Sequence, residues 1–420
     1  MTIPPEIVDY IIDYVHNDPK TLIACSLVAR DWVTSAHFHL FTKMSILTED
    51  DGTKLKELVN FSPNLLRHCQ ELTMGVINGF GKTPVPAGFV TFVEPPLTLP
   101  KRIDSFTSLR TLHICGLPFP PMDFIELLVA VSQKVTTINI TECSFESRHD
   151  LWKILRLFPN LQHVHASDLG YSFSGEGKLA IPPHRCHSPP IVSFSFYTHC
   201  MGFVLEELAE PPYPLTHLKS LEIRHTDQRQ EKLDSIATKY QDAITTLKFG
   251  ANSAFGSGVF ILPPSIPRRS QSHFTDIPPH IGLYNCLQTL ILGKLEFFAA
   301  YPLNHRTSPT IPCFSWVATA IEQIKSRLNR LVFEIAVTKR RDLDAIYWED
   351  VDEFLNSHEQ FEDLEAVDVV FLDTIPTKVT WQPHTLHPGV DLREDIMKRM
   401  RRTVERGLMR CSTRGLRTQW

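Results

Sequence analysis

Residues 109–114 read LRTLHI, residues 135–140 read VTTINI and residues 161–166 read LQHVHA, and these stretches decide the fold. Each has an apolar residue, two further residues, a second apolar residue, one residue and a third apolar residue. The copies lie 26 residues apart. The last two apolar positions alternate, as they do when a strand places residues i and i+2 on one face. The sequence therefore predicts a short strand that recurs at a regular interval.

The pattern continues on both sides of these stretches. Its middle apolar residue falls at positions 72, 112, 138, 164, 194, 221, 247, 290, 331 and 367. Apolar residues at helical spacing precede many copies, as in residues 121–133, 149–158, 231–243 and 314–328. The repeating unit is thus a helix, a turn and a strand. Because such a unit cannot bury its apolar face alone, the copies are expected to stack into a parallel sheet with helices on one side.

This array resembles the leucine-rich repeat, whose core reads L-x-x-L-x-L, over roughly residues 60–375. The resemblance implies an α/β solenoid. The repeat's usual Asn or Cys after the strand is mostly missing, and Thr141-Glu142-Cys143 and Ile114-Cys115 match it only loosely. The array is therefore degenerate, and we assign it to residues 46–375.

Irregular steps between copies mark four insertions. Proline without a period, accompanied by Gly and Ser, is typical of loops. The insertions span residues 76–104, 170–190, 250–282 and 299–313. In a solenoid such loops gather on one rim, where they either bind a partner or are tolerated as ordinary surface loops.

The N-terminal segment, residues 3–41, reads IPPEIVDYIIDYVHNDPKTLIACSLVARDWVTSAHFHLF. A proline at position 4 or 5 can begin a helix, because the first turn needs no proline N–H. Asn17-Asp18-Pro19 ends that helix, Lys20–Ala29 forms a second, and a third short helix or turn runs through Leu40-Phe41. Helices this short cannot form a stable domain alone. The array or a partner must cover their excess apolar surface.

This segment resembles the F-box, whose pattern runs Leu-Pro-x-Glu-(Ile/Leu), an apolar helix, a turn with Pro, and then Leu-x-x-x-Ser-Leu-Val-x-Arg-x-Trp. The family usually has Leu at the first position and often Cys before the Arg, where this chain has Ile3 and Ala29. The matching residues are Ile3, Pro4, Glu6, Ile7, Ile11, Ile12, Val15, Pro19, Leu22, Ser26, Leu27, Val28, Arg30 and Trp32.

The combination with a degenerate repeat array resembles F-box proteins of the fungal type. The resemblance implies a non-catalytic substrate-recognition adaptor, docked through residues 1–45 on a Skp-type adaptor and through it on a cullin-based ubiquitin ligase. It assigns the docking role to Ile3, Pro4, Ile7, Ile11, Leu22 and Val28, and the core of the helical domain to Val15, Leu27 and Trp32. The alternative is a scaffold without a ligase role, whose N-terminal helices only cap the solenoid and bury their apolar surface internally.

The substrate would be a protein held by exposed strand residues and loops of the array, and its identity is not encoded in a recognisable pattern. The candidate contact residues are Arg110, His113, Thr137, Asn139, His163, His165, Glu222 and Arg224.

Charge is unevenly distributed toward the C-terminus. Residues 342–377 hold twelve carboxylates and no Lys or Arg, whereas residues 391–420 hold nine Lys or Arg against four acids, a net of +5. A basic run, Lys398–Arg402, lies on an expected helix, Asp391–Met409. We expect residues 376–420 to form a basic helical cap or tail; a nuclear-import signal, a contact for acidic substrate segments and a solvated helix face remain alternatives.

Composition and motifs exclude several classes of protein. The net charge of −5 disfavours a nucleic-acid-binding surface, and no apolar run is long enough to span a bilayer. Nine scattered cysteines without a CxxC pair indicate reduced thiols and a cytoplasmic or nuclear location. No catalytic or nucleotide-binding motif occurs, and the cluster His184-Arg185-Cys186-His187 lacks a second ligand pair. The sequence thus predicts no catalytic residue, metal site or cofactor.

Overall fold

The computed structural model describes residues 3–75, 106–119, 122–145, 147, 149–171, 187–197, 206, 208–211, 215–225, 230–251, 281–296, 321–336, 348–372 and 417–419. The chain divides into two compact units. The first comprises residues 1–207 and 211–217, and the second comprises residues 208–210 and 218–420. The N-terminal helices therefore share a unit with the first strands of the array, and the expected array, residues 46–375, extends across both units.

Three helices begin the first unit: α1 (Pro5–Tyr14), α2 (Pro19–Val28) and α3 (Arg30–Thr42). Proline opens α1, as the sequence predicted, and Pro19 opens α2, one residue before the expected start at Lys20. Asp18 caps α2 by accepting the N–H groups of Lys20 and Thr21. The hydrogen bonds from Thr21 lower the pKa of Asp18, so this cap stays ionised at neutral pH. The third helix is longer than expected and contacts the next strand.

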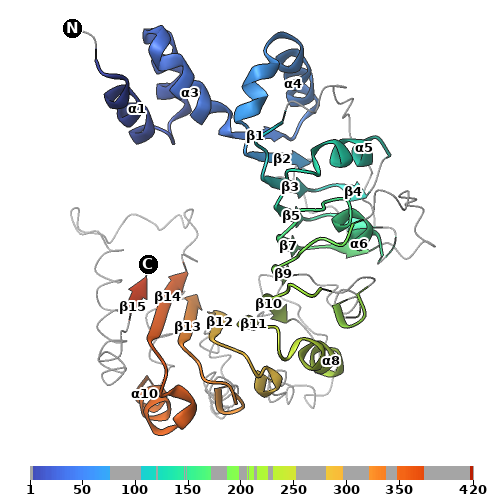
Figure 1. Cartoon of the computed structure of the whole chain (residues 1–420), viewed down its shortest axis with the longest axis vertical. Helices are drawn as coiled ribbons and strands as arrows, with labels where there is room; N and C mark the ends of the chain where they lie inside the picture. The colour runs from blue at the N-terminus through green and yellow to red at the C-terminus, as the bar shows by residue number, and fades with distance from the viewer. Residues whose placement is uncertain are drawn as a thin grey trace, which may run out of the picture. The chain divides into compact units, whose positions relative to one another are not determined.

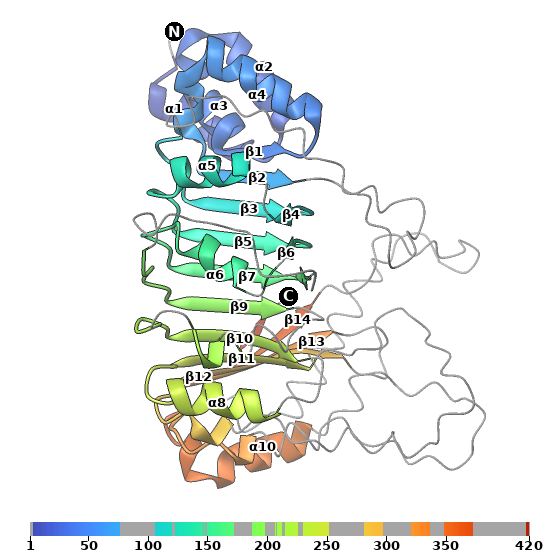
Figure 2. The ribbon, with the colours of Figure 1, turned by 90° about the vertical axis from the view of Figure 1, so that its right-hand side faces the viewer.

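A parallel sheet forms the body of the first unit. Its strands, in spatial order, are β1 (Lys43–Ile46), β2 (Glu71–Gly75), β3 (Thr111–Cys115), β5 (Thr137–Thr141), β7 (His163–Ser167) and β9 (Ser193–Tyr197). Figure 2 shows them stacked one above another. The predicted repeat positions align: Leu72 pairs with Leu112, Leu112 with Ile138, Ile138 with Val164 and Val164 with Phe194. All five are buried, which confirms the predicted strands.

The strand β1 was missed by the sequence prediction. Met44 and Ile46 pair with Leu72 and Met74 of β2, so β1 is an additional strand of the stack. Phe41, Met44 and Ile46 fit the repeat pattern, but Phe41 also fits the end of the preceding helix. The structure shows that Phe41 belongs to the helix, because α3 ends at Thr42 and the chain becomes extended at Lys43.

Three consecutive repeats turn in the same way after their strands. Gly116, Glu142 and Asp168, each 26 residues from the next, have φ values of 64°, 54° and 51°. The next residue of each repeat is buried, and a two-residue strand follows, which gives a second sheet of β4 (Pro118–Phe119), β6 (Ser144–Phe145) and β8 (Gly170–Tyr171). Cys143 is one of these buried residues, and its thiol donates to the carbonyl oxygens of Ile114 and Thr141.

This turn gives a direct test of the repeat. We expect Glu142→Val to lower the free energy of unfolding by about 1–2 kcal/mol, because a β-branched side chain is strained in the left-handed region. Glu142→Gly should change the free energy of unfolding by no more than about 0.5 kcal/mol. Glycine relieves backbone strain in the folded protein, and this gain offsets the greater conformational entropy that glycine gives the unfolded chain. Urea unfolding of both variants measures the difference, and equal stabilities would contradict the role of backbone conformation here.

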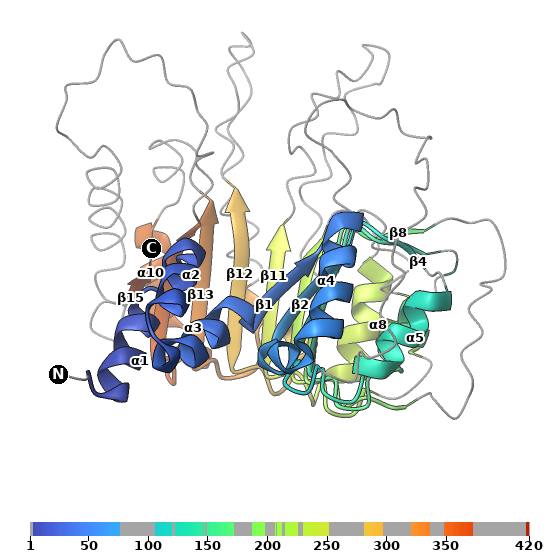
Figure 3. The same ribbon diagram turned by 90° about the horizontal axis from the view of Figure 1, so that it is seen from above.

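Helices cover one side of the first sheet. They are α4 (Glu49–Phe61), α5 (Met122–Val131) and α6 (Asp150–Leu155), with a 3₁₀ turn, η1 (Pro63–His68), before β2. Figures 1 and 3 show α4 and α5 on the same side of the strands. The expected helices within residues 121–133 and 149–158 are confirmed. Between the layers, the Trp152 ring stacks on Phe194 with centroids 5.8 Å apart.

The second unit repeats this arrangement. Its parallel strands are β10 (Ser220–His225), β11 (Thr246–Ala251), β12 (Thr289–Glu296), β13 (Arg330–Ala336), β14 (Ala366–Leu372) and β15 (Arg417–Gln419). The helical segments between them are α8 (Gln230–Tyr240), η5 (Ile281–Leu283), α10 (Trp348–Ser357) and η7 (Glu359–Phe361). The predicted positions again pair in register, from Leu221 through Leu247, Leu290 and Leu331 to Val367.

The C-terminal residues return to the acidic repeat. Strand β15 pairs with β14, with Asp368 opposite Arg417 and Val370 opposite Gln419, so the tail adds a strand that the sequence did not predict. The expected helix 391–409, its basic run and the insertions 76–104, 250–282 and 299–313 lie almost wholly outside the described residues, as do residues 172–186 of the insertion 170–190. Each unit is thus a parallel repeat array consistent with a leucine-rich-repeat-like solenoid.

Candidate functional site

The helices α1 and α2 lie at one end of the first unit (Figure 2). Large apolar side chains are exposed on both helices and at Ile3, which precedes α1. We call them the N-terminal apolar surface: Ile3, Ile7, Tyr10, Ile11, Tyr14, Ile23, Leu27 and Val28. Leu27 is 82% exposed and Ile7 50%. Outside this surface, the large exposed apolar side chains among the described residues are Phe38 and Phe61. Apolar side chains grouped in this way are typical of protein–protein contact sites.

The first helix has two apolar stripes. Val8 and Ile12 face inward and form a small core with Leu22 of α2, against which Val15, Trp32 and Leu40 pack. The second stripe, which includes Ile7, Ile11 and Tyr14, lies at helical spacing on the solvent side. The helix therefore buries only one of its two stripes.

Polar contacts fasten α1 to α3. The Ser35 hydroxyl donates to the Asp9 carboxylate, and His39 Nε2 lies 2.7 Å from Asp13 Oδ1. Asp9 and Asp13 are one helical turn apart, as are Ser35 and His39, so the two contacts form one above the other. They hold α1 in a set orientation and leave its second stripe exposed.

The structure changes two of the residue assignments in α2. Leu22, expected to contact the adaptor, is 1% exposed and belongs to the core. Leu27, expected in the core, is at the surface. The sequence could not distinguish them because α2 is apolar all round, so no periodicity marks its inner face. The helix faces inward through Leu22 and Cys25 because these side chains meet the inner stripe of α1 and α3.

The other predicted residues divide as follows. Ile3, Pro4, Ile7, Ile11 and Val28, assigned to docking, are all exposed. Val15 and Trp32, assigned to the core, are partly buried against it. Tyr10, Tyr14 and Ile23 were not assigned, although Tyr10 and Tyr14 lie three residues after Ile7 and Ile11 and could have been found by helical spacing.

Six of the residues proposed as substrate contacts alternate with buried residues of their strands and therefore lie on the side of the sheet away from the helices: His113, Thr137, Asn139, His163, His165 and Glu222. Arg110 precedes β3. Arg110 and His163 are exposed; His113, Thr137, Asn139, His165 and Glu222 are half-exposed. The side chain of Arg224 is outside the described set. In the second unit Lys248 lies 3.2 Å from Glu222 and 2.8 Å from Glu334. A Cβ at Gly293 would lie 3.0 Å from Lys248 Cε, so glycine leaves room for this lysine to cross β12.

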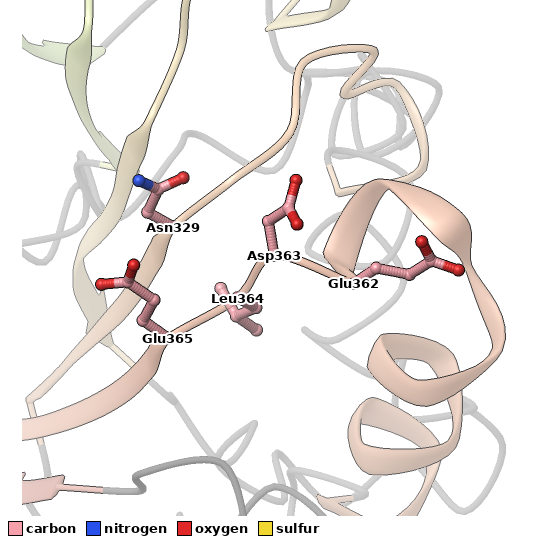
Figure 4. A pocket seen from close by; sticks show the side chains of 5 residues that line it. All are labelled: Asn329, Glu362, Asp363, Leu364 and Glu365. Atoms are coloured by element: carbon pink, nitrogen blue, oxygen red, sulfur yellow. The ribbon is translucent and has the colours of Figure 1, made fainter.

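A polar pocket lies before β13 and β14, lined by Asn329, Glu362, Asp363, Leu364 and Glu365 (Figure 4). In this view Glu362 is directed away from Asn329 and Glu365. The Asp363 carboxylate is 3.1 Å from Arg327 and is therefore already neutralised. The lining includes no Ser, Thr, Cys, Lys or His side chain, so its ionisable groups are the carboxylates of Glu362, Asp363 and Glu365.

The described residues also contain no cluster of three or more His, Cys, Asp or Glu side chains that could hold a metal ion. Burial raises the pKa values of the Cys69 and Cys143 thiols to about 12, so both stay protonated and unreactive. Among the described helices, none combines the length and apolarity needed to cross a membrane.

No model of a known protein family matches this chain, and no curated protein matches it.

Proposed function

We propose that this protein is a substrate-recognition adaptor of a Skp–cullin–F-box ubiquitin ligase. The observation that carries the proposal is the N-terminal apolar surface. Three helices whose core consists of Val8, Ile12 and Leu22 leave eight large apolar side chains in solvent. A second protein that covers these side chains would remove their apolar surface from water. Each Å² buried in this way stabilises the complex by about 25 cal/mol.

The order of the F-box-like residues along the chain supports a Skp-type adaptor as the protein that covers this surface. The docking role that the resemblance implies is kept for Ile3, Pro4, Ile7, Ile11 and Val28. Leu22 is assigned instead to the core that supports them. Leu27 and Tyr14 join the proposed docking set because their side chains are among the most exposed on these helices. An adaptor that presents an apolar groove to α1 and α2 would match this surface.

In this proposal the protein performs no chemistry. The docking helices attach it to the Skp-type adaptor and the cullin, and the repeat array holds a protein substrate. The substrate is then kept near the catalytic subunits, whose reaction is accelerated by proximity. A cytoplasmic or nuclear location follows from the same proposal.

The alternative is a scaffold whose N-terminal helices only cap the array. A cap buries its apolar side chains against the next repeat. Ile7, Tyr10, Tyr14 and Leu27 are at least half exposed, which favours the docking role over the cap.

The decisive experiment is co-purification with a Skp-type adaptor. We expect Ile7→Asp combined with Ile11→Asp to lower the affinity about 100-fold or more, because two carboxylates would lose water in an apolar contact. Pull-down and calorimetry with the purified adaptor measure the loss.

A control is Phe61→Asp, which places a carboxylate at a more exposed apolar position on α4, outside the proposed contact. This variant should bind the adaptor like the wild type. Undiminished binding of the double variant, or failure of the wild-type protein to bind any Skp-type adaptor, would refute the ligase proposal. Circular dichroism of each variant establishes that the array is still folded.

A further inference from the structure

The outward side chains of β3, β5, β7 and β9 form a surface made of rows. Parallel pairing aligns these strands residue for residue, so equivalent side chains lie beside one another. We call this surface the β3–β9 face. Its rows are Thr111, Thr137, His163 and Ser193; then His113, Asn139, His165 and Ser195; then Cys115, Thr141 and Ser167.

None of these eleven side chains is Asp, Glu, Lys or Arg, although such residues make up 21% of the chain. Charged side chains flank the face instead, with Arg110 before β3 and Glu142 and Asp168 in the turns after β5 and β7. At its β2 side, Lys43 and Glu71 are 2.9 Å apart and neutralise each other. Among the described side chains, the face is therefore a continuous uncharged surface.

Hydrogen bonds between neighbouring strands hold these side chains in place. The Asn139 amide donates to His113 Nδ1 over 3.0 Å, and the Ser167 hydroxyl donates to Thr141 Oγ1 over 3.1 Å. His165 Nδ1 lies 2.8 Å from Ser195 Oγ. Side chains already ordered in the free protein lose little entropy when a partner binds. The face is thus preorganised for hydrogen bonding.

The imidazole of His113 belongs to this uncharged set. Burial lowers the pKa of His113; Glu71 opposes this effect and Lys43 adds to it. The ring is accordingly neutral at physiological pH, with one nitrogen accepting from Asn139 and the other carrying a proton. It offers a hydrogen bond without attracting an anion.

We infer that the β3–β9 face is where the array holds its substrate, and that it takes an uncharged, unphosphorylated segment of a protein in extended form. This inference rests on the proposed adaptor function. Hydroxyl, amide and imidazole groups can satisfy the backbone and the Ser, Thr, Asn or Gln side chains of such a segment. A phosphate or carboxylate would lose its water there without gaining a cation, which is unfavourable. Four strands span about 14 Å, the length of about four extended residues.

The test uses a display library of random linear peptides, selected on the full-length protein. We expect the enriched peptides to be poor in charged residues. A synthetic copy of one should bind at least about tenfold more weakly to Asn139→Asp, since that variant adds a charge at the centre of the face without changing its shape. Phosphorylation of a serine within the peptide should weaken binding similarly. Asn64→Asp makes the same exchange at an exposed position in η1 and should bind normally.

Three results would overturn the inference: enrichment of acidic or basic peptides, undiminished binding of the peptide after phosphorylation or to Asn139→Asp, or no enrichment. Preference for neutral oligosaccharides on a glycan array, with no peptide bound, would also overturn it. His163→Glu, at an exposed position of the outer row, gives the same comparison if Asn139→Asp fails to fold.

Binding of the Skp-type adaptor is measured on the same variants. If peptide binding fails while the adaptor still binds, the β3–β9 inference is wrong and the ligase proposal stands. If the adaptor fails to bind while uncharged peptides bind the face, the ligase proposal is wrong and the face remains a peptide-binding site.

Discussion

Leu22→Asp is expected to unfold the three N-terminal helices. The side chain is 1% exposed and packs with Val8 and Ile12, so the substitution removes a core side chain and places a carboxylate in its position. Loss of a buried leucine alone costs about 2–5 kcal/mol, and burial of the carboxylate adds to this. A core of this size cannot offset such a loss.

Hydrogen exchange measured by mass spectrometry checks this result locally. The amides of α1 and α2 should lose protection in Leu22→Asp, whereas those of β3, β5 and β7 should keep it. Leu27→Asp is the matched control, five residues along the same helix and 82% exposed. It should leave exchange unchanged while weakening adaptor binding. If Leu27→Asp unfolds the helices as well, the orientation of α2 described above is wrong.

Phe194→Ala is expected to lower the free energy of unfolding of the first unit by about 3–5 kcal/mol. The Phe194 ring is fully buried, stacks on Trp152 and lies 6.3 Å from the ring of Phe196. Removal of the ring leaves a cavity where β9 meets the helix layer, because the surrounding side chains relax only partly into the space. Exchange of the β7 and β9 amides and urea unfolding both report this loss.

The substitution Phe61→Ala provides the comparison for Phe194→Ala. Phe61 is 83% exposed at the end of α4, so Phe61→Ala should change stability by less than about 0.5 kcal/mol. If Phe194→Ala and Phe61→Ala changed the free energy of unfolding by similar amounts, the role in stability that the burial of Phe194 indicates would be wrong.

The strands of the array could be predicted because their signal is local. A residue such as Leu112 and its equivalent Ile138 must both face the core if the strands stack, so the same spacing recurs wherever a strand occurs. The turn after each strand was harder to predict. Glu142 and Asp168 adopt a conformation that favours glycine, and their side chains gave no sign of it.

The candidate surface could be predicted in part. Ile3, Ile7 and Ile11 were assigned to it from the F-box-like pattern, and all three are exposed. The assignments within α2 failed because its sequence is apolar on every side. Strand β15 was missed for another reason, since the three residues 417–419 pair with β14 from far along the chain and carry too short a pattern to recognise.

The order of residues alone determined that the chain forms short, regularly spaced strands with helices between them, because alternation and helical spacing are properties of neighbouring residues. Tertiary structure decided which apolar side chains of α1 and α2 are buried and which reach solvent. Several faces of these helices are equally apolar, so the choice depends on which of them meets α3 and the other members of the small core. It also decided that the uncharged side chains of four separate repeats lie together, since only the pairing of strands brings them side by side.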